Sequence, residues 1–198
     1  MSERLAAWVP LLFVGILAAL TFWLDRAVQL PDREAGMPPR HDPDYIVDKL
    51  TAARMSKTGA TSYTLAAEKM IHYPDDDTTA LITPRFVSYG SAKAPVTITS
   101  REALISPNGD HVYFQQDVRV TRAAYDGHSE MVMRTAFLHV MPEKHLARTD
   151  RSVTITDEAT VVTADGLELN SETRILKLLS NVRGTYDPAK APPRDGKR

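Results

Sequence analysis

The chain has 198 residues, with 25 acidic and 24 basic side chains, a formal net charge of −1 and no cysteine. The lack of cysteine excludes a disulfide scaffold, a thiolate metal site and a cysteine nucleophile. A net charge this close to zero provides no basic footprint for nucleic acid, so we expect no nucleic-acid partner. The length suits one domain with its own core.

A long apolar segment lies near the N-terminus. Residues 5–24 (LAAWVPLLFVGILAALTFWL) contain no charged side chain. Twenty residues at a helical rise of about 1.5 Å match the hydrocarbon core of a bilayer, about 30 Å thick. A cleavable signal would be shorter and would end in small residues, whereas this segment ends in Thr-Phe-Trp-Leu. It therefore predicts a single transmembrane anchor helix, with residues 1–4 cytoplasmic and the remaining chain outside.

Three further segments follow the predicted anchor. Residues 25–43 are rich in proline and charge and lack periodicity, which is typical of a linker. Residues 44–187 have the composition of a folded domain. Residues 188–198 (PAKAPPRDGKR) predict a disordered tail.

The domain is expected to consist of short strands. Residues 44–58 fit either a helix or a strand, and we favour a strand because Ile46, Asp48 and Leu50 alternate. The later expected strands are residues 62–73, 81–89, 96–99, 111–121, 130–141, 153–156, 159–163 and 173–186. Turn sequences separate them, among them Ser106–Asp110 and Asp165–Gly166. Such spacing without long helices predicts an all-β antiparallel sandwich, jellyroll or related fold.

One pattern occurs twice. Val112–Arg119 and Leu176–Arg183 both read apolar-x-apolar-x-x-[Asp/Asn]-Val-Arg. Two strand pieces would flank a kink, at which the Asp or Asn side chain bonds its own backbone. A repeat of β units indicates stacked hairpins around one interior, and a chance match is the alternative.

Alternation along the strands leaves two interpretations open. Phe114 and Val118 share one face of their strand, as do Leu176, Leu178 and Val182 of theirs. These faces could form an ordinary packed core or an open apolar groove for a lipid chain. Both arrangements give the same alternation, and the residues alone favour the packed core.

No arrangement of residues indicates catalysis or a metal site. The six histidines form no HxH or HExxH motif, and we expect His139 and His145 to be surface or edge residues and not metal ligands. Asp75–Asp77 lacks the alternating ligands of a calcium loop, and no G-x-S-x-G or P-loop string occurs. We therefore expect no enzyme, no catalytic residue, no metal site and no cofactor.

Several short motifs nevertheless occur in a characteristic order. They are Pro43-Asp44-Tyr45, Tyr63-x-Leu65-x-Ala67, His72-Tyr73-Pro74, Thr83-Pro84, Val118-Arg119-Val120, Leu138-x-Val140-x-Pro142 and Leu178–Tyr186. Over residues 5–187 the chain resembles the LptC family of lipopolysaccharide export proteins of Gram-negative bacteria. It departs from the family pattern at Val96–Ile98, where many relatives have tryptophan.

The resemblance implies an open, twisted antiparallel β-jellyroll in the periplasm, held at the inner membrane by the single anchor. Such proteins receive lipopolysaccharide from the ABC transporter LptBFG and pass it to LptA through an apolar interior. This reverses the preference for a closed core. The expected lumen residues are Leu50, Leu65, Leu81, Phe86, Phe114, Leu138, Leu176 and Tyr186. The expected joining edges are Tyr45 and Leu50 towards the transporter, and Leu176, Leu178, Val182 and Tyr186 towards LptA.

Two alternatives remain beside this non-catalytic relay. A membrane-tethered scaffold would join envelope proteins without binding lipid, and it requires a closed core. An anchored envelope hydrolase would require a catalytic constellation that the sequence does not reveal.

Overall fold

The computed structural model describes residues 8–28, 41–89, 94–173 and 175–190. It consists of two compact units, divided between Arg40 and His41. The first contains helix α2 (Trp8–Val28), whose large apolar side chains from Leu12 onward are more than half exposed. Within the described residues, none of the helices is long and apolar enough to cross a membrane.

Parts of the expected chain organisation lie outside this description. The expected anchor, residues 5–24, begins before the first described residue, and anchoring stays a prediction. The cytoplasmic end, most of the linker and most of the tail lie outside the described residues. The described start of the tail is a short 3₁₀ helix, η2 (Pro188–Lys190).

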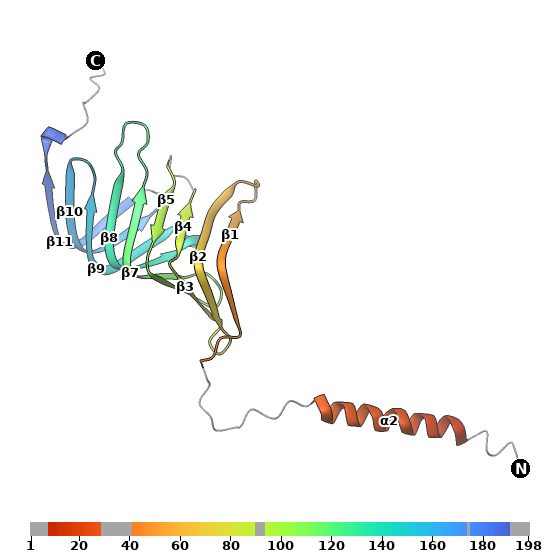
Figure 1. The fold of residues 1–198 in the computed structure, drawn as a ribbon. Coiled ribbons are helices and arrows are strands. Elements are labelled where there is room, and N and C mark those ends of the chain that lie inside the picture. The colour runs from red at the N-terminus through yellow and green to blue at the C-terminus, as the bar shows by residue number, and fades with distance from the viewer. Residues whose placement is uncertain (1–7, 29–40, 90–93, 174, 191–198) are drawn as a thin grey trace, which may run out of the picture. The chain divides into compact units, whose positions relative to one another are not determined.

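The second unit is an antiparallel sheet of 11 strands (Figure 1). The strands are β1 (Tyr45–Met55), β2 (Thr61–Tyr73), β3 (Thr78–Ile82), β4 (Arg85–Ser88), β5 (Val96–Thr99), β6 (Glu102–Ile105), β7 (Val112–Arg122), β8 (Met131–Met141), β9 (Leu146–Thr156), β10 (Thr160–Asn170) and β11 (Ile175–Tyr186). A 3₁₀ turn, η1 (Pro142–Lys144), joins β8 to β9. The prediction of an all-β antiparallel fold is confirmed.

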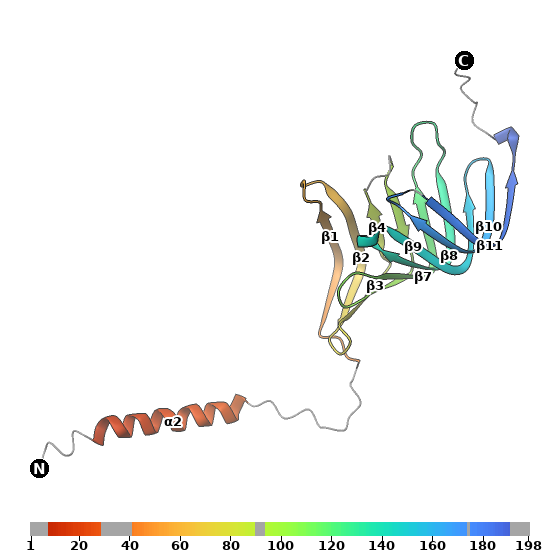
Figure 2. The same ribbon diagram turned by 180° about the vertical axis from the view of Figure 1, so that it is seen from behind.

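The sheet folds back on itself into two layers (Figures 1 and 2). The short strands β3 and β6 lie between the second half of β2 and the first half of β7. The short strands β4 and β5 lie between the other halves of the same two strands. We call the layer that contains β3 and β6 layer A, and the layer that contains β4 and β5 layer B. The longer strands pass from one layer into the other.

The long strands bend where the layers meet, and we call this line the crease. Asp117 in β7 and Asn181 in β11 have φ angles of 55° and 52° there, and Gly166 in β10 has 83°. The kinks predicted from the repeat are therefore confirmed. The side chains of Asp117 and Asn181, however, bond other segments and not their own backbone. Asp117 pairs with Arg101 Nε at 2.6 Å, and Asn181 Nδ2 donates to an Asp165 carboxylate oxygen at 2.7 Å.

Some strand boundaries differ from those expected. The single expected strand 81–89 is two strands, because Thr83 has a φ of 51° and Pro84 donates no hydrogen bond to a ladder. Strand β6 was not expected. Asp165–Gly166, expected as a turn, is a bulge inside β10.

The core lies between the two layers. Leu81, Phe114 and Leu138 of layer A are essentially inaccessible, with 0–1% of each residue exposed. Phe86 of layer B reaches Phe114, with ring centroids 6.3 Å apart in an edge-to-face arrangement. Such contacts join the inner faces of the layers by burial and aromatic packing.

Candidate functional site

A continuous apolar stripe crosses the inner face of layer B. Its residues lie directly opposite one another from β1 to β11: Ala52, Leu65, Phe86, Ile98, Val120, Met133, Ile155, Val162 and Gly184. Eight steps between neighbouring strands, each about 4.8 Å, give it a length of about 38 Å. The stripe therefore runs through the whole domain from one free sheet edge to the other.

A second stripe crosses the inner face of layer A. It consists of Ile105, Val112, Val140, Ala147, Leu169 and Leu176, which pair in that order from β6 to β11. Leu81, Phe114 and Leu138 lie beside it in a neighbouring row. The two stripes provide two apolar walls that enclose the core.

The expected lumen residues fall into two groups. Leu81, Phe86, Phe114 and Leu138 belong to the buried core, and Leu50 and Leu65 pack against it. Leu176 and Tyr186 are 42% and 58% exposed instead. They lie on β11, which pairs only with β10 among the strands that the structure describes. The structure thus brings six of the eight residues together in the interior.

An ion pair joins the two layers on the β1 side. Arg54 at the layer B end of β1 contacts Glu143 of η1, which follows the layer A half of β8. Its Nη1 lies 2.7 Å from Glu143 Oε1, and both side chains are half exposed. A hydrogen bond to Tyr63 and the charge of Glu143 raise the pKa of Arg54. This contact holds the layers together at the surface, but exposed pairs contribute little to stability.

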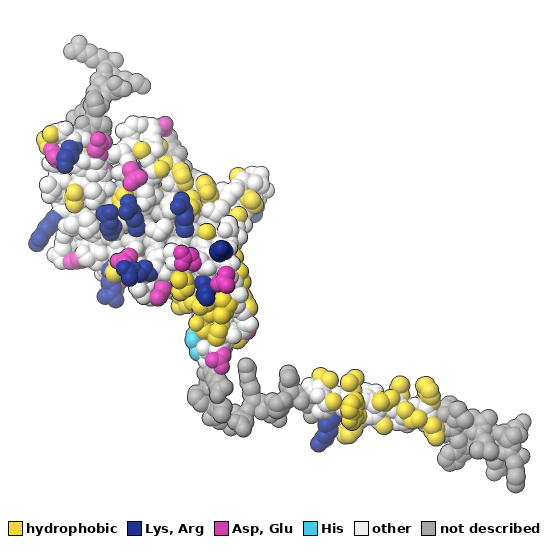
Figure 3. Space-filling model, viewed as in Figure 1, with side chains coloured by type: hydrophobic (Ala, Val, Ile, Leu, Met, Phe, Trp, Pro, Cys, Tyr) yellow, Lys and Arg dark blue, Asp and Glu magenta, His cyan; other side chains and the backbone are white. Residues whose placement is uncertain are grey.

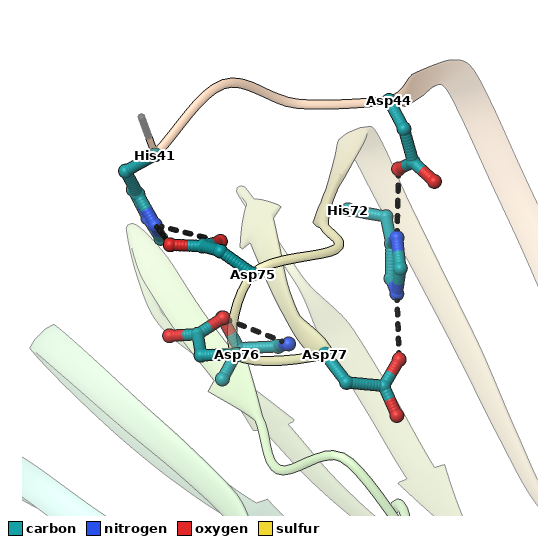
Figure 4. A network of polar contacts seen from close by, with 7 residues as sticks. His41, Asp44, His72, Asp75, Asp76 and Asp77 are labelled. Atoms are coloured by element: carbon teal, nitrogen blue, oxygen red, sulfur yellow. Dashed lines mark hydrogen bonds and ion pairs between the residues drawn. The ribbon is translucent and has the colours of Figure 1, made fainter. Parts of the chain in front are cut away.

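The start of β1 is fixed by a cluster of histidines and aspartates (Figure 4). His72 lies between Asp44 and Asp77, with Nδ1–Oδ1 and Nε2–Oδ1 distances of 2.7 and 3.0 Å. These hydrogen bonds raise the pKa of His72, and the bond from His72 lowers the pKa of Asp44. His72 also stacks on Tyr45, with centroids 4.6 Å apart. The contacts hold β1 against the β2–β3 turn.

A second pair in the same cluster holds the residues before β1. His41 Nδ1 lies 2.9 Å from Asp75 Oδ2, and its ring stacks on Tyr73. The hydrogen bond raises the pKa of His41 and lowers that of Asp75. Ligand atoms of His41, Asp75 and Asp76 lie within 4.8 Å of one another, so these exposed side chains could hold a cation.

His139 is buried, so the expectation that it lies at the surface was wrong. Tyr113 stacks on its ring at 4.5 Å, and Arg148 Nε donates to its Nδ1 at 3.3 Å. His111 contacts its other nitrogen at 2.9 Å. Burial, followed by the charge of Arg148, lowers the pKa of His139. The contacts of His139 therefore join three strands on the outer face of layer A.

Both ends of the sheet are open edges. The side of β1 that faces away from β2, and the side of β11 that faces away from β10, have no neighbouring strand among the described residues. Tyr45 and Ile46 on β1 are about half exposed, and so are Leu179 and Val182 on β11. Leu178 packs partly against the core. A long apolar edge strand is a template for pairing with another chain.

A protein-family model matches most of the chain. A family model described as "Lipopolysaccharide-assembly, LptC-related" matches residues 11–187. The chain belongs to this family. Its family thus places the chain in lipopolysaccharide transport, in agreement with the resemblance drawn from the motifs.

The fold is also similar to a solved structure. LptH, the LptA-homologous periplasmic component of the lipopolysaccharide transport device from Pseudomonas aeruginosa, matches with a TM-score of 0.51. The match covers 64% of this chain and 95% of LptH, at 7% sequence identity, so it concerns the jellyroll-like fold alone. No curated protein sequence matches the chain. The family's description as a lipopolysaccharide-assembly family agrees with a non-enzymatic role.

Sequence reasoning missed several residues of the stripes. Ile98, Met133, Ile155 and Val162 were not among the expected lumen residues, although all face the interior. The alternation of apolar residues along each strand could have indicated that these residues face inward. Their position in one stripe depends on the register between strands, and local periodicity does not reveal register.

Proposed function

We propose that the jellyroll is a non-catalytic relay that carries the acyl chains of lipopolysaccharide between layers A and B. The observation that carries this proposal is the pair of apolar stripes, one of which extends from β1 to β11. A saturated chain gains about 0.8 kcal/mol for each CH₂ group that it buries. Two apolar walls therefore suffice for binding, without a dedicated polar group.

Entry of an acyl chain requires the two layers to separate. The interior side chains Leu81, Phe114 and Leu138 are at most 1% exposed, which leaves them no contact with an outside chain. The Arg54–Glu143 ion pair closes the β1 side. Because an exposed pair costs little to break, this ion pair adds little to the cost of separating the layers, which is set by the apolar surface that separation exposes.

We assign one partner to each of the two sheet edges. The β1 edge, at Tyr45 and Leu50, would join the ABC transporter LptBFG, which supplies the lipid. The β11 edge, at Leu176, Leu178, Val182 and Tyr186, would join LptA by strand addition. In this arrangement the domain lies in the periplasm, and residues 5–24 tether it to the inner membrane.

A crosslink across the layers tests the proposal. The chain has no cysteine, so Arg54→Cys with Glu143→Cys provides a unique pair for a short bismaleimide. We expect the crosslinked chain to lose at least tenfold in affinity for lipopolysaccharide. The matched control joins Arg54→Cys to Tyr63→Cys, which are cross-strand neighbours within layer B, and should bind normally. Unchanged binding by the cross-layer product would refute the proposal.

A scaffold that binds no lipid is the second candidate, and the dense packing of the interior favours it. In that case the domain would join envelope proteins through its two edges only. The unmodified chain would then show no saturable binding of lipopolysaccharide, while partner capture through β1 and β11 would persist.

A further inference from the structure

A straight row of arginines and threonines crosses the outer face of layer B. Its members pair directly across neighbouring strands from β4 to β11: Arg85, Thr99, Arg119, Arg134, Thr154, Thr163 and Arg183. We call it the arginine row. Six strand spacings of about 4.8 Å give it a length of about 29 Å. In Figure 3 dark-blue side chains form a line across this face.

The row next to it carries no charge. It consists of Val87, Thr97, Thr121, Val132, Thr156, Val161 and Thr185, which also lie opposite one another. Neither row contains an acidic side chain. The two rows therefore present cations and hydroxyl groups without an anion among them, although the chain as a whole has a net charge of −1.

The arginine row lacks a structural explanation within the domain. Among the described residues, its four arginines form no ion pair, whereas Arg54, Arg101 and Arg151 each contact a carboxylate. Arg119 and Arg134 lie directly opposite each other. Like charges in that position destabilise a sheet. An external anion would remove this repulsion.

The chemistry of the row favours phosphate groups. A guanidinium presents a planar fork of donors that binds phosphate through two hydrogen bonds, and all four cations are arginine rather than lysine. Threonine hydroxyls between them add donors. Arg119 and Arg134 also line a surface hollow of about 640 Å³, next to the crease, together with Asp117, whose carboxylate pairs with Arg101. A row of this length on the face of a sheet matches an extended anionic surface.

We propose that the outer face of layer B docks on a bilayer surface that contains anionic phospholipids. A lipid surface is favoured over an acidic protein because the same chain carries the apolar helix α2, whose exposed leucine, valine and phenylalanine side chains also suit lipid. Docking places the arginine row against headgroup phosphates and the threonines of the neutral row beside it. This inference does not depend on binding of lipopolysaccharide in the interior.

A fluorescent label on this face tests the proposal. The full chain carries Thr121→Cys with an environment-sensitive dye and is mixed with vesicles free of lipopolysaccharide. We expect a blue shift with vesicles that contain phosphatidylglycerol and none with pure phosphatidylcholine. The shift should disappear at high salt, because screening weakens exposed charge pairs. A dye at Lys177→Cys in layer A should not respond.

Substitution of the arginines separates the row from general charge. Replacing Arg85, Arg119, Arg134 and Arg183 with glutamine should weaken the vesicle-induced shift at least tenfold in lipid concentration. The matched control, Arg101→Gln with Arg151→Gln, removes two arginines that already contact carboxylates and should retain it. Circular dichroism checks the folding of each variant.

Three results would overturn the proposal. The first is an equal shift with both kinds of vesicle, which would assign the contact to α2. The second is an unchanged shift in the fourfold variant. The third is a response to poly-glutamate but not to anionic vesicles, which would assign the face to an acidic protein.

Discussion

Strands β7 and β11 contain the same sequence pattern but lie in opposite environments. Phe114 and Val118 in β7 are 0% and 1% exposed. Their equivalents in β11 are Leu178, which is partly buried, and Val182, which is 52% exposed. Both strands kink at the equivalent Asp117 and Asn181. The difference comes from the neighbouring strands, because in the described part of the chain β7 has strands on both sides and β11 has one on a single side.

This comparison shows that one pattern serves two purposes. In β7 the apolar positions hold layers A and B together through burial. In β11 the same positions extend the inner faces to an open edge, with Leu176 at the end of the layer A stripe. An incoming strand could bury them as β8 buries the positions in β7. The β11 edge therefore presents apolar positions that continue the inner faces and that an added strand could bury.

The largest effect is expected from a charge at the equivalent valines. Val118→Asp would bury a carboxylate without a partner, and the protein should fail to fold. Val182→Asp at the open edge should change the free energy of unfolding by less than about 1 kcal/mol. Denaturant unfolding, followed by circular dichroism, measures both. Similar losses of stability in the two variants would contradict the comparison.

The same edge substitution should affect partner capture. Val182→Asp introduces charge at the surface proposed to receive LptA, and we expect at least a tenfold loss in LptA capture. Val161→Asp, on the outer face of the neighbouring strand, is the matched control and should capture normally. Retained capture by Val182→Asp would exclude the β11 edge as the contact.

Truncation at the equivalent apolar positions should give a smaller contrast. Phe114→Ala removes a fully buried ring and should cost about 3–5 kcal/mol of stability. Leu178→Ala should cost less than half as much, because its side chain already contacts solvent. Differential scanning calorimetry of the two variants provides the comparison, and equal costs would show that β11 is packed as tightly as β7.

A glycine on the neighbouring strand tests the kink of the edge. Gly166 has a φ of 83°, and a Cβ there would lie 2.9 Å from Cδ1 of Leu179. Gly166→Ala should therefore destabilise the domain by about 1–2 kcal/mol, chiefly through the left-handed backbone. Gly184→Ala, with its nearest contact at 3.9 Å and no positive φ, should lie within about 0.5 kcal/mol of the parent.

The smallest effect concerns the opposite edge, where His72 and His41 hold the start of β1. Their raised pKa values mean that protonation stabilises these contacts, fully below about pH 6.5 and progressively less as pH rises through the raised values. After correction for the base-catalysed rise in intrinsic exchange, the protection factors of residues 44–48 should fall between neutral and alkaline pH. Asp44→Asn with Asp77→Asn, which removes both partners of His72, should abolish the part of this fall that His72 causes. Protection factors that do not change with pH in the parent would refute the role of the two histidines.

The sequence predicted strands and kinks well because both depend on local patterns. Asp117 and Asn181 stood out in the repeat before their backbone angles were known. The register of nine strands in one stripe, and the exposure of Leu176 and Tyr186, could not be predicted, because both depend on which strand lies beside which. His139 was misplaced for the same reason, since Tyr113 and Arg148 cover it from neighbouring strands.

The central claim is that acyl chains pass between the layers, and photocrosslinking tests it most directly. A photoreactive phenylalanine analogue replaces Phe86, whose side chain belongs to the layer B stripe, or Val161, which lies on the outer face and is 42% exposed. In the complete transporter with ATP, we expect lipopolysaccharide adducts at position 86 and few at position 161. Adducts at position 161 alone, or equal adducts at both, would contradict transport through the interior.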